Sequence, residues 1–436
     1  MRPISWLIPL LVFAMRTATA AAEPAHEILM TFWSDDTTNH PDYPLPGSVD
    51  ATGVALKNAA FLRQLDAIDV LAYAFLQVDG AGEVYFRNPT VDLSASDSQG
   101  FCHQNPAACP KSQSAQAGSF DAFAHLTNRP RTLKKIISIG GAGSQGPFDN
   151  ALGHPEVFVR SAVALIHAFG LDGIDLDFEP DAFFGPKQGE QIARIIADLR
   201  KGLGEQAFIS IELPGDWETL RSFDCPAGSR CHNNLGVVAQ GAYVSLMGYD
   251  FHGPEYSPVT GHHANLYSDQ DEPLLAGFYH LSDQQAVEYL TFRRVPASRI
   301  LLGYPAYFVA YGGVEASPGT HGLYQPFDKS RTPAYDLGGA KGRGSYRVAE
   351  TLLKSGFTEH GVLVNGRLSA VYAYDPASRQ WLSYDNAALV ASKARYVVAK
   401  HLAGMMMWEI GEDLPLSSPK SLLKSAHTTL LGARAD

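Results

Sequence analysis

The chain has 436 residues, of which 45% are hydrophobic and 18% are charged, as is typical of a globular protein with a large core. Its 34 Lys and Arg residues are outnumbered by 45 Asp and Glu residues, so the formal net charge is −11. We therefore expect no nucleic-acid partner, because phosphate binding requires clustered basic residues. The length allows one large α/β domain with an insertion, or two to three average domains.

The amino terminus has the pattern of an export signal. A basic start at Arg2 precedes a mostly apolar run over residues 4–15, which is too short to span a membrane, and small residues at 18–22 offer cleavage sites. We expect a signal peptide over residues 1–22, a secreted protein that is extracellular or periplasmic, and no membrane association after cleavage. The alternative is that this run forms a buried first helix.

Eight short apolar runs along the chain have the composition of buried β-strands. The expected strands cover residues 27–32, 69–76, 134–139, 172–179, 207–213, 242–247, 299–303 and 404–408. Helix patterns alternate with them, near residues 54–65, 154–169, 188–203, 284–294, 386–400 and 418–431. A long loop over residues 79–118 follows the second strand, and a loop of this length is usually functional.

Eight apolar strands that alternate with helices predict a (β/α)8 TIM barrel, an α/β fold whose parallel strands are buried on both faces. A doubly wound sheet is the alternative, but no GxGxxG motif follows an early strand. Residues 311–375 interrupt the alternation with glycines, prolines and short β runs. We therefore expect a barrel over residues 23–310 and 376–436, with a small α+β insertion over 311–375 between strands seven and eight.

Four cysteines fall into two pairs that are close in sequence, and each pair bounds a turn-rich loop. In an exported protein this spacing favours two local disulfides, Cys102 with Cys109 and Cys225 with Cys231, although four cysteines allow three connectivities. A zinc site is the alternative, but neither pair has CxxC spacing. We expect no metal and no cofactor.

The fourth expected strand alternates acidic and apolar residues. Side chains two apart on a strand share a face, so Asp175, Asp177 and Glu179 lie together on one face. Like charges at this spacing raise one another's pKa, which predicts a buried, proton-sharing relay that ends at Glu179. Asp172 has the opposite parity, which predicts a structural role. The alternative is a half-exposed strand with a solvated acidic face.

Other reactive side chains also fall at the ends of expected strands. Tyr249 and Asp250 follow strand six, and Trp408 ends strand eight. Taken singly, they could be a core tyrosine, a turn residue and a packing residue. Catalytic groups of TIM barrels lie at the carboxyl ends of the strands, so the coincidence favours a shared site.

These motifs together resemble those of glycoside hydrolase family 18, the chitinases. Residues 172–179 fit the DxxDxDxE signature. Smaller matches are Tyr73 to Phe75 (YAF), Ser138 to Gly141 (SxGG), 247–253 (MxYDxxG), 260–263 (TGHH) and 407–409 (the final strand). The expected insertion is similar to the extra domain of deep-grooved bacterial and animal chitinases.

The resemblance implies substrate-assisted, retaining hydrolysis of β-1,4 linkages in N-acetylglucosamine polymers, with chitin or chito-oligosaccharide as substrate. It implies that Glu179 is the general acid and base. It further implies that Asp177 binds the acetamide N–H, that Asp175 shares a proton with Asp177, and that Tyr249 holds the acetamide oxygen. Ser138 would be structural. The implied substrate-binding residues are Asp250, Trp408, Tyr73, Phe75, Met247, Gly140, Gly141 and Tyr307.

Two positions depart from the family pattern. Val309 stands where the family often has Arg, in Tyr-x-Arg after strand seven, and Glu255 stands where a Trp commonly follows MxYDxxG. One sugar contact and one aromatic subsite therefore lack their usual residues. Candidates for gripping an insoluble chain are the aromatic residues Trp33, Trp217, Tyr256 and Tyr267.

Two other functions share this pattern. An endo-β-N-acetylglucosaminidase that acts on N-linked glycans carries the acidic signature but usually lacks the insertion. A chitin-binding lectin of this fold typically lacks the catalytic Glu, whereas Glu179 is present. We therefore expect a secreted chitinase, and we expect it to be a monomer.

Overall fold

The computed structural model describes residues 27–34, 63–87, 92–93, 119–124, 126, 132–179, 185–225, 230–274, 280–337 and 341–432. The expected signal peptide, most of the expected helix at 54–65 and the expected Cys102–Cys109 pair lie outside the described residues. None of the described helices is long and apolar enough to cross a membrane.

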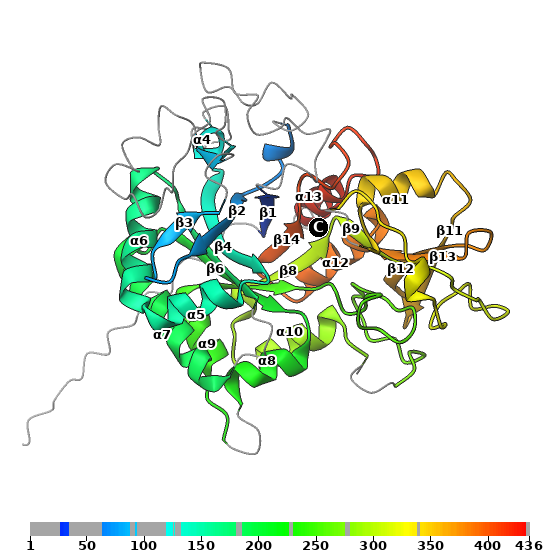
Figure 1. Cartoon of the computed structure of the whole chain (residues 1–436), viewed down its shortest axis with the longest axis horizontal. Helices are drawn as coiled ribbons and strands as arrows, with labels where there is room; N and C mark the ends of the chain where they lie inside the picture. Colours follow the sequence, from blue (N-terminus) through cyan, green and yellow to red (C-terminus); the bar gives the residue numbers. More distant parts are fainter. Residues whose placement is uncertain are drawn as a thin grey trace, which may run out of the picture.

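A ring of eight parallel strands forms the centre of the fold (Figure 1). The strands are β1 (Ile28–Ser34), β2 (Val70–Val78), β4 (Lys134–Ala142), β5 (Gly173–Glu179), β6 (Phe208–Pro214), β7 (Tyr243–Met247), β8 (Ile300–Pro305) and β14 (Gly404–Trp408). The pairing of β1 with both β2 and β14 closes the ring, so the predicted TIM barrel is confirmed and the doubly wound sheet is excluded. A short strand, β3 (Val84–Phe86), pairs antiparallel with β2.

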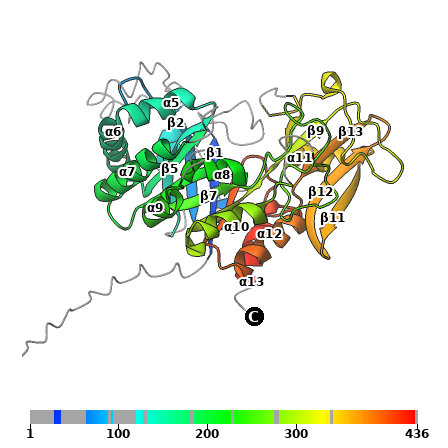
Figure 2. The same cartoon turned by 90° about the horizontal axis from the view of Figure 1, so that it is seen from below.

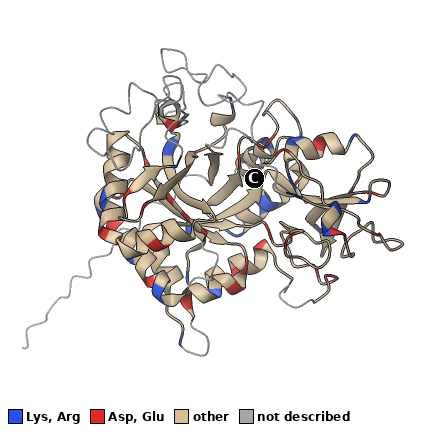
Figure 3. Ribbon diagram, viewed as in Figure 1, with Lys and Arg blue, Asp and Glu red and all other residues tan. Residues whose placement is uncertain are grey.

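Helices surround the barrel, as Figures 1 and 2 show from two directions. They are α4 (Ser119–Ala124), α5 (Gln145–Gly153), α6 (Pro155–Ala168), α7 (Pro186–Leu203), α8 (Trp217–Asp224), α9 (Asn234–Gly241), α10 (Asp283–Phe292), α12 (Ala387–Ala399) and α13 (Leu422–Gly432), with the short 3-10 helix η2 (Ala297–Arg299). Charged residues of both signs are spread over these outer helices (Figure 3).

Helix α6 illustrates why these segments form where they do. Pro155 occupies its first turn, where the missing N–H needs no partner. Phe158, Ala162 and Leu165 are buried at helical spacing and form the face that packs on the barrel. The helix ends at Ala168, and Gly170 follows with a φ of 58°.

Between β8 and β14 the chain forms a second, antiparallel sheet of five strands beside the barrel (Figure 2). Its order is β10 (Arg343–Ser345), β9 (Tyr307–Tyr311), β13 (Gln380–Tyr384), β12 (Arg367–Asp375) and β11 (Thr358–Val364), and it is joined by α11 (Tyr346–Leu352) and the 3-10 helix η3 (Lys329–Arg331). The strands of this sheet run from Tyr307 to Tyr384. The expected domain limits at 311 and 375 stay a prediction.

The apolar side chains of β5 point outward beneath the helices. The ring of Phe178 lies 5.4 Å from that of Phe148 on α5 and 6.1 Å from that of Phe158 on α6. Because side chains alternate along a strand, the acidic residues of β5 point to the opposite side, into the barrel. The barrel therefore encloses the carboxyl groups that the sequence places on one face.

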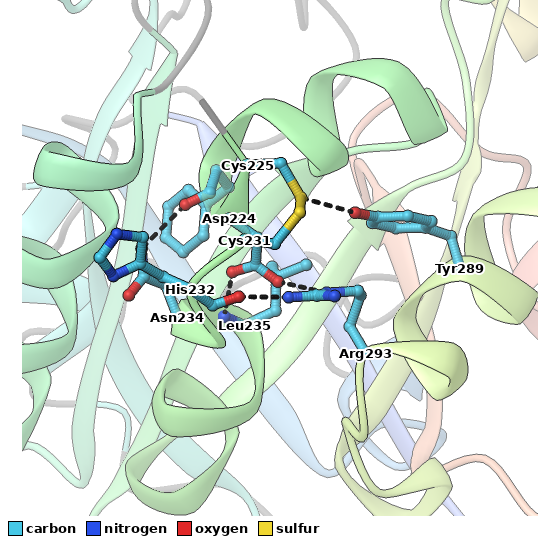
Figure 4. The surroundings of a disulfide bond; sticks show 9 residues. Asp224, Cys225, Cys231, His232, Asn234, Leu235, Tyr289 and Arg293 are labelled. Carbon is cyan, nitrogen blue, oxygen red and sulfur yellow. Dashed lines mark hydrogen bonds and ion pairs between the residues drawn. A yellow bond between two sulfur atoms is a disulfide. The ribbon is translucent and has the colours of Figure 1, made fainter. Parts of the chain in front are cut away.

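Cys225 and Cys231 form a disulfide in the loop between α8 and α9, with an S–S distance of 2.11 Å, so this predicted pair is confirmed (Figure 4). The same loop is held by Asp224, whose Oδ2 lies 2.7 Å from Arg293 Nε and whose Oδ1 accepts a hydrogen bond from Leu235 N at 3.0 Å. Because both sulfur atoms are bonded to each other, this pair holds no zinc.

Candidate active site

Asp175 lies at the base of the acidic face of β5, between two serine hydroxyls. Its Oδ2 accepts a hydrogen bond from Ser138 Oγ on β4 at 2.7 Å, and its Oδ1 accepts one from Ser210 Oγ on β6 at 2.6 Å. The strand register pairs Asp175 with both serines. Burial raises the pKa of Asp175 to about 6, although the two hydroxyls lower it.

Asp177 is the next residue on the same face and is 3% exposed. Its Oδ1 has no hydrogen-bond partner among the described residues. Burial raises its pKa well above the usual value, and the charges of Glu179, Asp175 and Glu212 raise it further. Asp177 therefore tends to keep a proton, as the relay hypothesis requires.

Glu179 ends β5 and is partly exposed. Its backbone N–H donates a hydrogen bond to Ser144 Oγ at 2.9 Å, which fixes the end of the strand. Burial, followed by the charge of Asp250, raises the pKa of Glu179 to about 7. A carboxyl group with this pKa is protonated for part of the time at neutral pH, which suits a general acid.

Asp250 follows β7 with a left-handed backbone, at a φ of 58°. Its Oδ1 accepts a hydrogen bond from Arg343 Nη1 at 2.7 Å and lies 3.8 Å from His263 Nδ1. Desolvation raises the pKa of Asp250, but the charge of Arg343 and the nearby His263 ring lower it to about 2. Asp250 is therefore ionised at neutral pH and is the charge that acts on Glu179.

An aromatic platform, formed by Phe32, Phe75 and Trp408, lies on strands β1, β2 and β14 of the barrel. The ring of Trp408, at the end of β14, stacks on that of Phe75 at 5.4 Å with an interplanar angle of 12°. Phe32 lies beside Trp408 with ring centroids 5.1 Å apart. Phe75, Trp408, Met247 and Tyr249 all pack against the same apolar cluster inside the barrel, so the structure brings these predicted site residues together.

Tyr249 lies between this platform and the second sheet. Its hydroxyl donates a long hydrogen bond to Met406 Sδ at 3.9 Å, and its ring meets that of Tyr307 edge-on at 5.9 Å. Burial raises the pKa of Tyr249 well above its usual value, and Glu212 raises it further. The phenol is therefore neutral and can act as a hydrogen-bond donor.

Two glycines leave room for this arrangement. Gly140 and Gly141 at the end of β4 have positive φ angles of 125° and 86°. A Cβ on Gly140 would come within 1.9 Å of Asp177 O, and one on Gly141 would come within 2.6 Å of the Phe75 ring. Both positions therefore need glycine, because β4 approaches Asp177 and Phe75 too closely for a side chain.

The structure does not bring Tyr73 to this group. Its side chain is fully buried on the outer face of β2, where the rings of Phe120 and Phe123 pack against it. Its hydroxyl donates a hydrogen bond to Asp92 Oδ1 at 2.5 Å. The parallel pairing of β2 with β4 shifts register between Tyr73 and Leu76, and this irregularity separates Tyr73 from Phe75.

Asp172 lies at the opposite end of β5 from Glu179. Its Oδ2 accepts a hydrogen bond from Lys135 N at 2.7 Å, and its backbone oxygen accepts one from Phe208 N at 2.9 Å. These contacts link the starts of β4, β5 and β6. Such contacts with the backbone of neighbouring strands are typical of a structural residue, and the structural role of Asp172 stays a prediction.

One of the four candidate groove aromatics lies at the site. Tyr256 is 46% exposed, and its hydroxyl donates a hydrogen bond to Asp250 O at 2.6 Å. The other three candidates also pack against neighbouring aromatic side chains; these candidates are Trp33, Trp217 and Tyr267.

Arg343 and Glu212, both near the site, were not predicted from the sequence. Arg343 on β10 stands directly opposite Val309 on β9, with its Nη2 3.9 Å from Glu255 Oε2. No local pattern could have found it, because it lies far along the chain from its partners. Glu212 on β6 did carry a signal, since it is an acidic residue inside an apolar strand and shares its face with Ser210.

The chain resembles known proteins over most of its length. A family model described as Glycosyl hydrolases family 18 matches residues 33–413. Chitinase 1 of Aphanocladium album is 26% identical over 367 residues, which cover 82% of this chain and 78% of that protein. Endochitinase 1 of Metarhizium robertsii (strain ARSEF 23 / ATCC MYA-3075) is 27% identical over 374 residues, which cover 84% of this chain and 80% of that protein.

Solved structures share the fold. The Group IV chitinase of Ostrinia furnacalis superposes with a TM-score of 0.70 at 19% identity, covering 93% of this chain and 100% of that one. The GH18 chitinase of Cycas revoluta, in complex with (GlcNAc)3, superposes with a TM-score of 0.66 at 20% identity, covering 92% of this chain and 99% of that one.

Proposed function

This chain belongs to glycosyl hydrolase family 18, and on that basis we propose that it is a secreted chitinase, which hydrolyses β-1,4 linkages in N-acetylglucosamine polymers. The observation that carries the proposal is the inward-facing row of Asp175, Asp177 and Glu179 on β5. Its last member lies at the carboxyl end of the barrel with a pKa of about 7.

In the first step, Glu179 protonates the glycosidic oxygen of the substrate. The bond to that oxygen breaks as the carbonyl oxygen of the substrate's own N-acetyl group attacks the anomeric carbon, which forms an oxazolinium ion. The pKa of Glu179 supports this role, because a general acid works best when its pKa is near the operating pH.

Asp177 would hold the acetamide N–H and stabilise the positive charge of the intermediate. Its Oδ1 has no partner among the described residues, so it is free to accept that hydrogen bond. Asp175 would share a proton with Asp177, and its two serine contacts keep it in place. The neutral hydroxyl of Tyr249 would hold the acetamide oxygen in line for attack.

In the second step, the carboxylate of Glu179 would take a proton from water, which then opens the oxazolinium ion. Two displacements at the same carbon give net retention of configuration. Trp408 and Phe75 would form the apolar floor beneath the sugar, since aromatic faces pack well on sugar rings. Asp250, which is held by Arg343 and by the hydroxyl of Tyr256, would help to bind the sugar.

A time course of products from chito-hexaose tests the proposal. We expect the wild type to release shorter oligosaccharides with retained anomeric configuration, and Glu179→Gln to lose about 10²–10⁴-fold in rate while keeping its fold. Glu205→Gln, on the surface before β6, is the matched control and should behave as the wild type. Near-normal turnover by Glu179→Gln would contradict the assignment. Release of glycan from a glycoprotein, without cleavage of chito-hexaose, would instead favour the endo-β-N-acetylglucosaminidase.

A further inference from the structure

Glu212 is a buried carboxyl group that the mechanism above does not use. It lies on β6, where Ile209, Ile211 and Leu213 pack outward into the core beneath the helices. Ser210 and Glu212 therefore point into the barrel, and Ser210 reaches Asp175. Glu212 is 1% exposed, so it is shielded from bulk solvent.

The strand register places Glu212 beside the catalytic row. Asp175 pairs with Ser210 and Leu176 pairs with Ile211, so Asp177 and Glu212 are the next residues on the two strands beyond this pairing, and the charge of Glu212 acts on Asp177. On its other side, Glu212 pairs with Ser245 of β7. The titratable groups that act on it are those of the catalytic row on β5 and the phenol of Tyr249 after β7.

Three carboxyl oxygens in this region lack partners. These oxygens have no hydrogen-bond partner among the described residues, and they are Glu212 Oε1, Glu212 Oε2 and Asp177 Oδ1. The same is true of Ser245 Oγ among those residues. Burying a neutral polar group without a hydrogen-bond partner costs on the order of 2–7 kcal/mol, and burying an ionised carboxylate without a donor costs more. Buried polar groups in native proteins are almost always hydrogen-bonded, so these oxygens need an explanation.

A proton shared between Glu212 and Asp177 would give two of these oxygens a partner, namely the Glu212 oxygen that carries the proton and Asp177 Oδ1. Burial raises the pKa of Glu212 well above its usual value, and the charge of Asp175 raises it further, while the Ser245 hydroxyl lowers it. A protonated carboxyl group is a donor that needs an acceptor. Among the described residues, the unpartnered acceptor on the adjacent strand is Asp177 Oδ1.

We propose that Glu212 is a positioning residue of this site, whose carboxyl proton is shared with Asp177, so that Asp177 can carry negative charge when the substrate's acetamide N–H arrives. The proposal rests on the proposed function. No bond to the substrate is involved: the proton moves between an oxygen of Glu212 and an oxygen of Asp177 and stays within the pair. The proton-sharing group therefore spans two strands, with Asp175 and Asp177 on β5 and Glu212 on β6.

Two substitutions separate this role from a merely structural one. Glu212→Met has a similar shape but no donor, whereas Glu212→Gln keeps an N–H donor in the same place. We expect Glu212→Met to lower kcat on chito-hexaose by about 10- to 100-fold with little change in KM. We also expect the acid limb of its pH–kcat profile to move to higher pH, because Asp177 must then ionise without a donor. Glu212→Gln should restore both towards the wild type.

Thermal unfolding provides the second readout. Glu212→Met leaves Asp177 without the donor with which it shares its proton, so we expect the Tm of Glu212→Met to lie below that of Glu212→Gln, with both variants folded at the assay temperature. Glu205→Gln, at the opposite end of β6, controls for loss of a Glu elsewhere and should change neither the Tm nor the activity.

The outcomes are distinct. A folded Glu212→Met variant would overturn the proposal if it kept the kcat of the wild type, or if its acid limb stayed in place or moved to lower pH. A Glu212→Gln variant as impaired as Glu212→Met would overturn it as well. Should Glu212→Met fail to fold, a wild-type profile in Glu212→Gln supports the shared proton and a displaced one overturns it. If the wild type itself releases no product from chito-hexaose, the proposed function fails instead.

Discussion

Glu179 and Asp250 are neighbouring carboxyl groups whose surroundings move their pKa values in opposite directions. Burial and the charge of Asp250 raise the pKa of Glu179 to about 7, whereas Arg343 and His263 bring that of Asp250 to about 2. At neutral pH one group can give up a proton and the other is ionised. Such a difference between adjacent carboxyl groups is how a fold assigns separate tasks to the same chemical group.

This pairing predicts the effect of removing the charge of Asp250. In Asp250→Asn the pKa of Glu179 should fall, because the raising charge is gone, so Glu179 loses its proton at a lower pH. We expect the basic limb of the pH–kcat/KM profile to move to lower pH, whatever the change in maximal rate. The same substitution at Asp198, exposed on α7, serves as the control, and an unmoved basic limb in Asp250→Asn would refute the coupling.

The pairing of β9 with β10 brings an arginine to a position at which β9 itself has a valine. Val309 occupies the position where the family often has Arg, and the residue opposite it across the pair is Arg343. The Arg343 guanidinium reaches Asp250 Oδ1 at 2.7 Å and lies 5.8 Å from the centre of the Tyr307 ring. A guanidinium group is therefore present at the site, although it comes from the neighbouring strand.

Substitution of Arg343 tests this arrangement. Arg343→Met keeps much of the aliphatic stem over Tyr307 but leaves Asp250 without its charged donor. Hydrogen bonds to charged groups contribute about 1.5–3 kcal/mol, so we expect kcat/KM on chito-hexaose to fall by roughly 10- to 100-fold. Arg331→Met, on the exposed helix η3, should leave kcat/KM unchanged. Equal activity of the two variants would show that Arg343 is not needed.

The strands of the barrel could be predicted because each is rich in apolar residues, and each begins at or one residue after its expected start. The inward face of β5 followed from its alternation. Tyr73 shows the limit of this approach, because it points outward with Leu71 by the regular alternation of β2, and only the irregular pairing after it turns Phe75 into the barrel. Arg343 could not be predicted, because its place depends on an antiparallel pairing between segments some thirty residues apart.

The barrel and the second sheet are connected by a buried group of three ionisable side chains. Lys393 Nζ on α12 lies 2.8 Å from Asp385 Oδ2, just after β13, and 3.3 Å from Asp283 Oδ2 at the start of α10. All three side chains are buried. Their contacts join two barrel helices to the end of the second sheet.

We expect Lys393→Met to lower the free energy of unfolding by about 3–5 kcal/mol, because two buried carboxyl groups would lose their shared cation. Chemical denaturation monitored by circular dichroism would measure it. Lys201→Met breaks an exposed pair with Asp198 and should cost about 1 kcal/mol or less. A similar loss in both variants would mean that the buried group does not stabilise the molecule as described.

Closure of the barrel joins the two ends of the polypeptide. Met30 on β1 pairs with Met406 on β14, so the first strand finds its last neighbour only after nearly the whole sequence has been synthesised. While the ribosome is still at work, β1 has an unpaired edge and the ring cannot be completed. A nascent chain of this design can therefore complete its barrel core only once synthesis has passed β14.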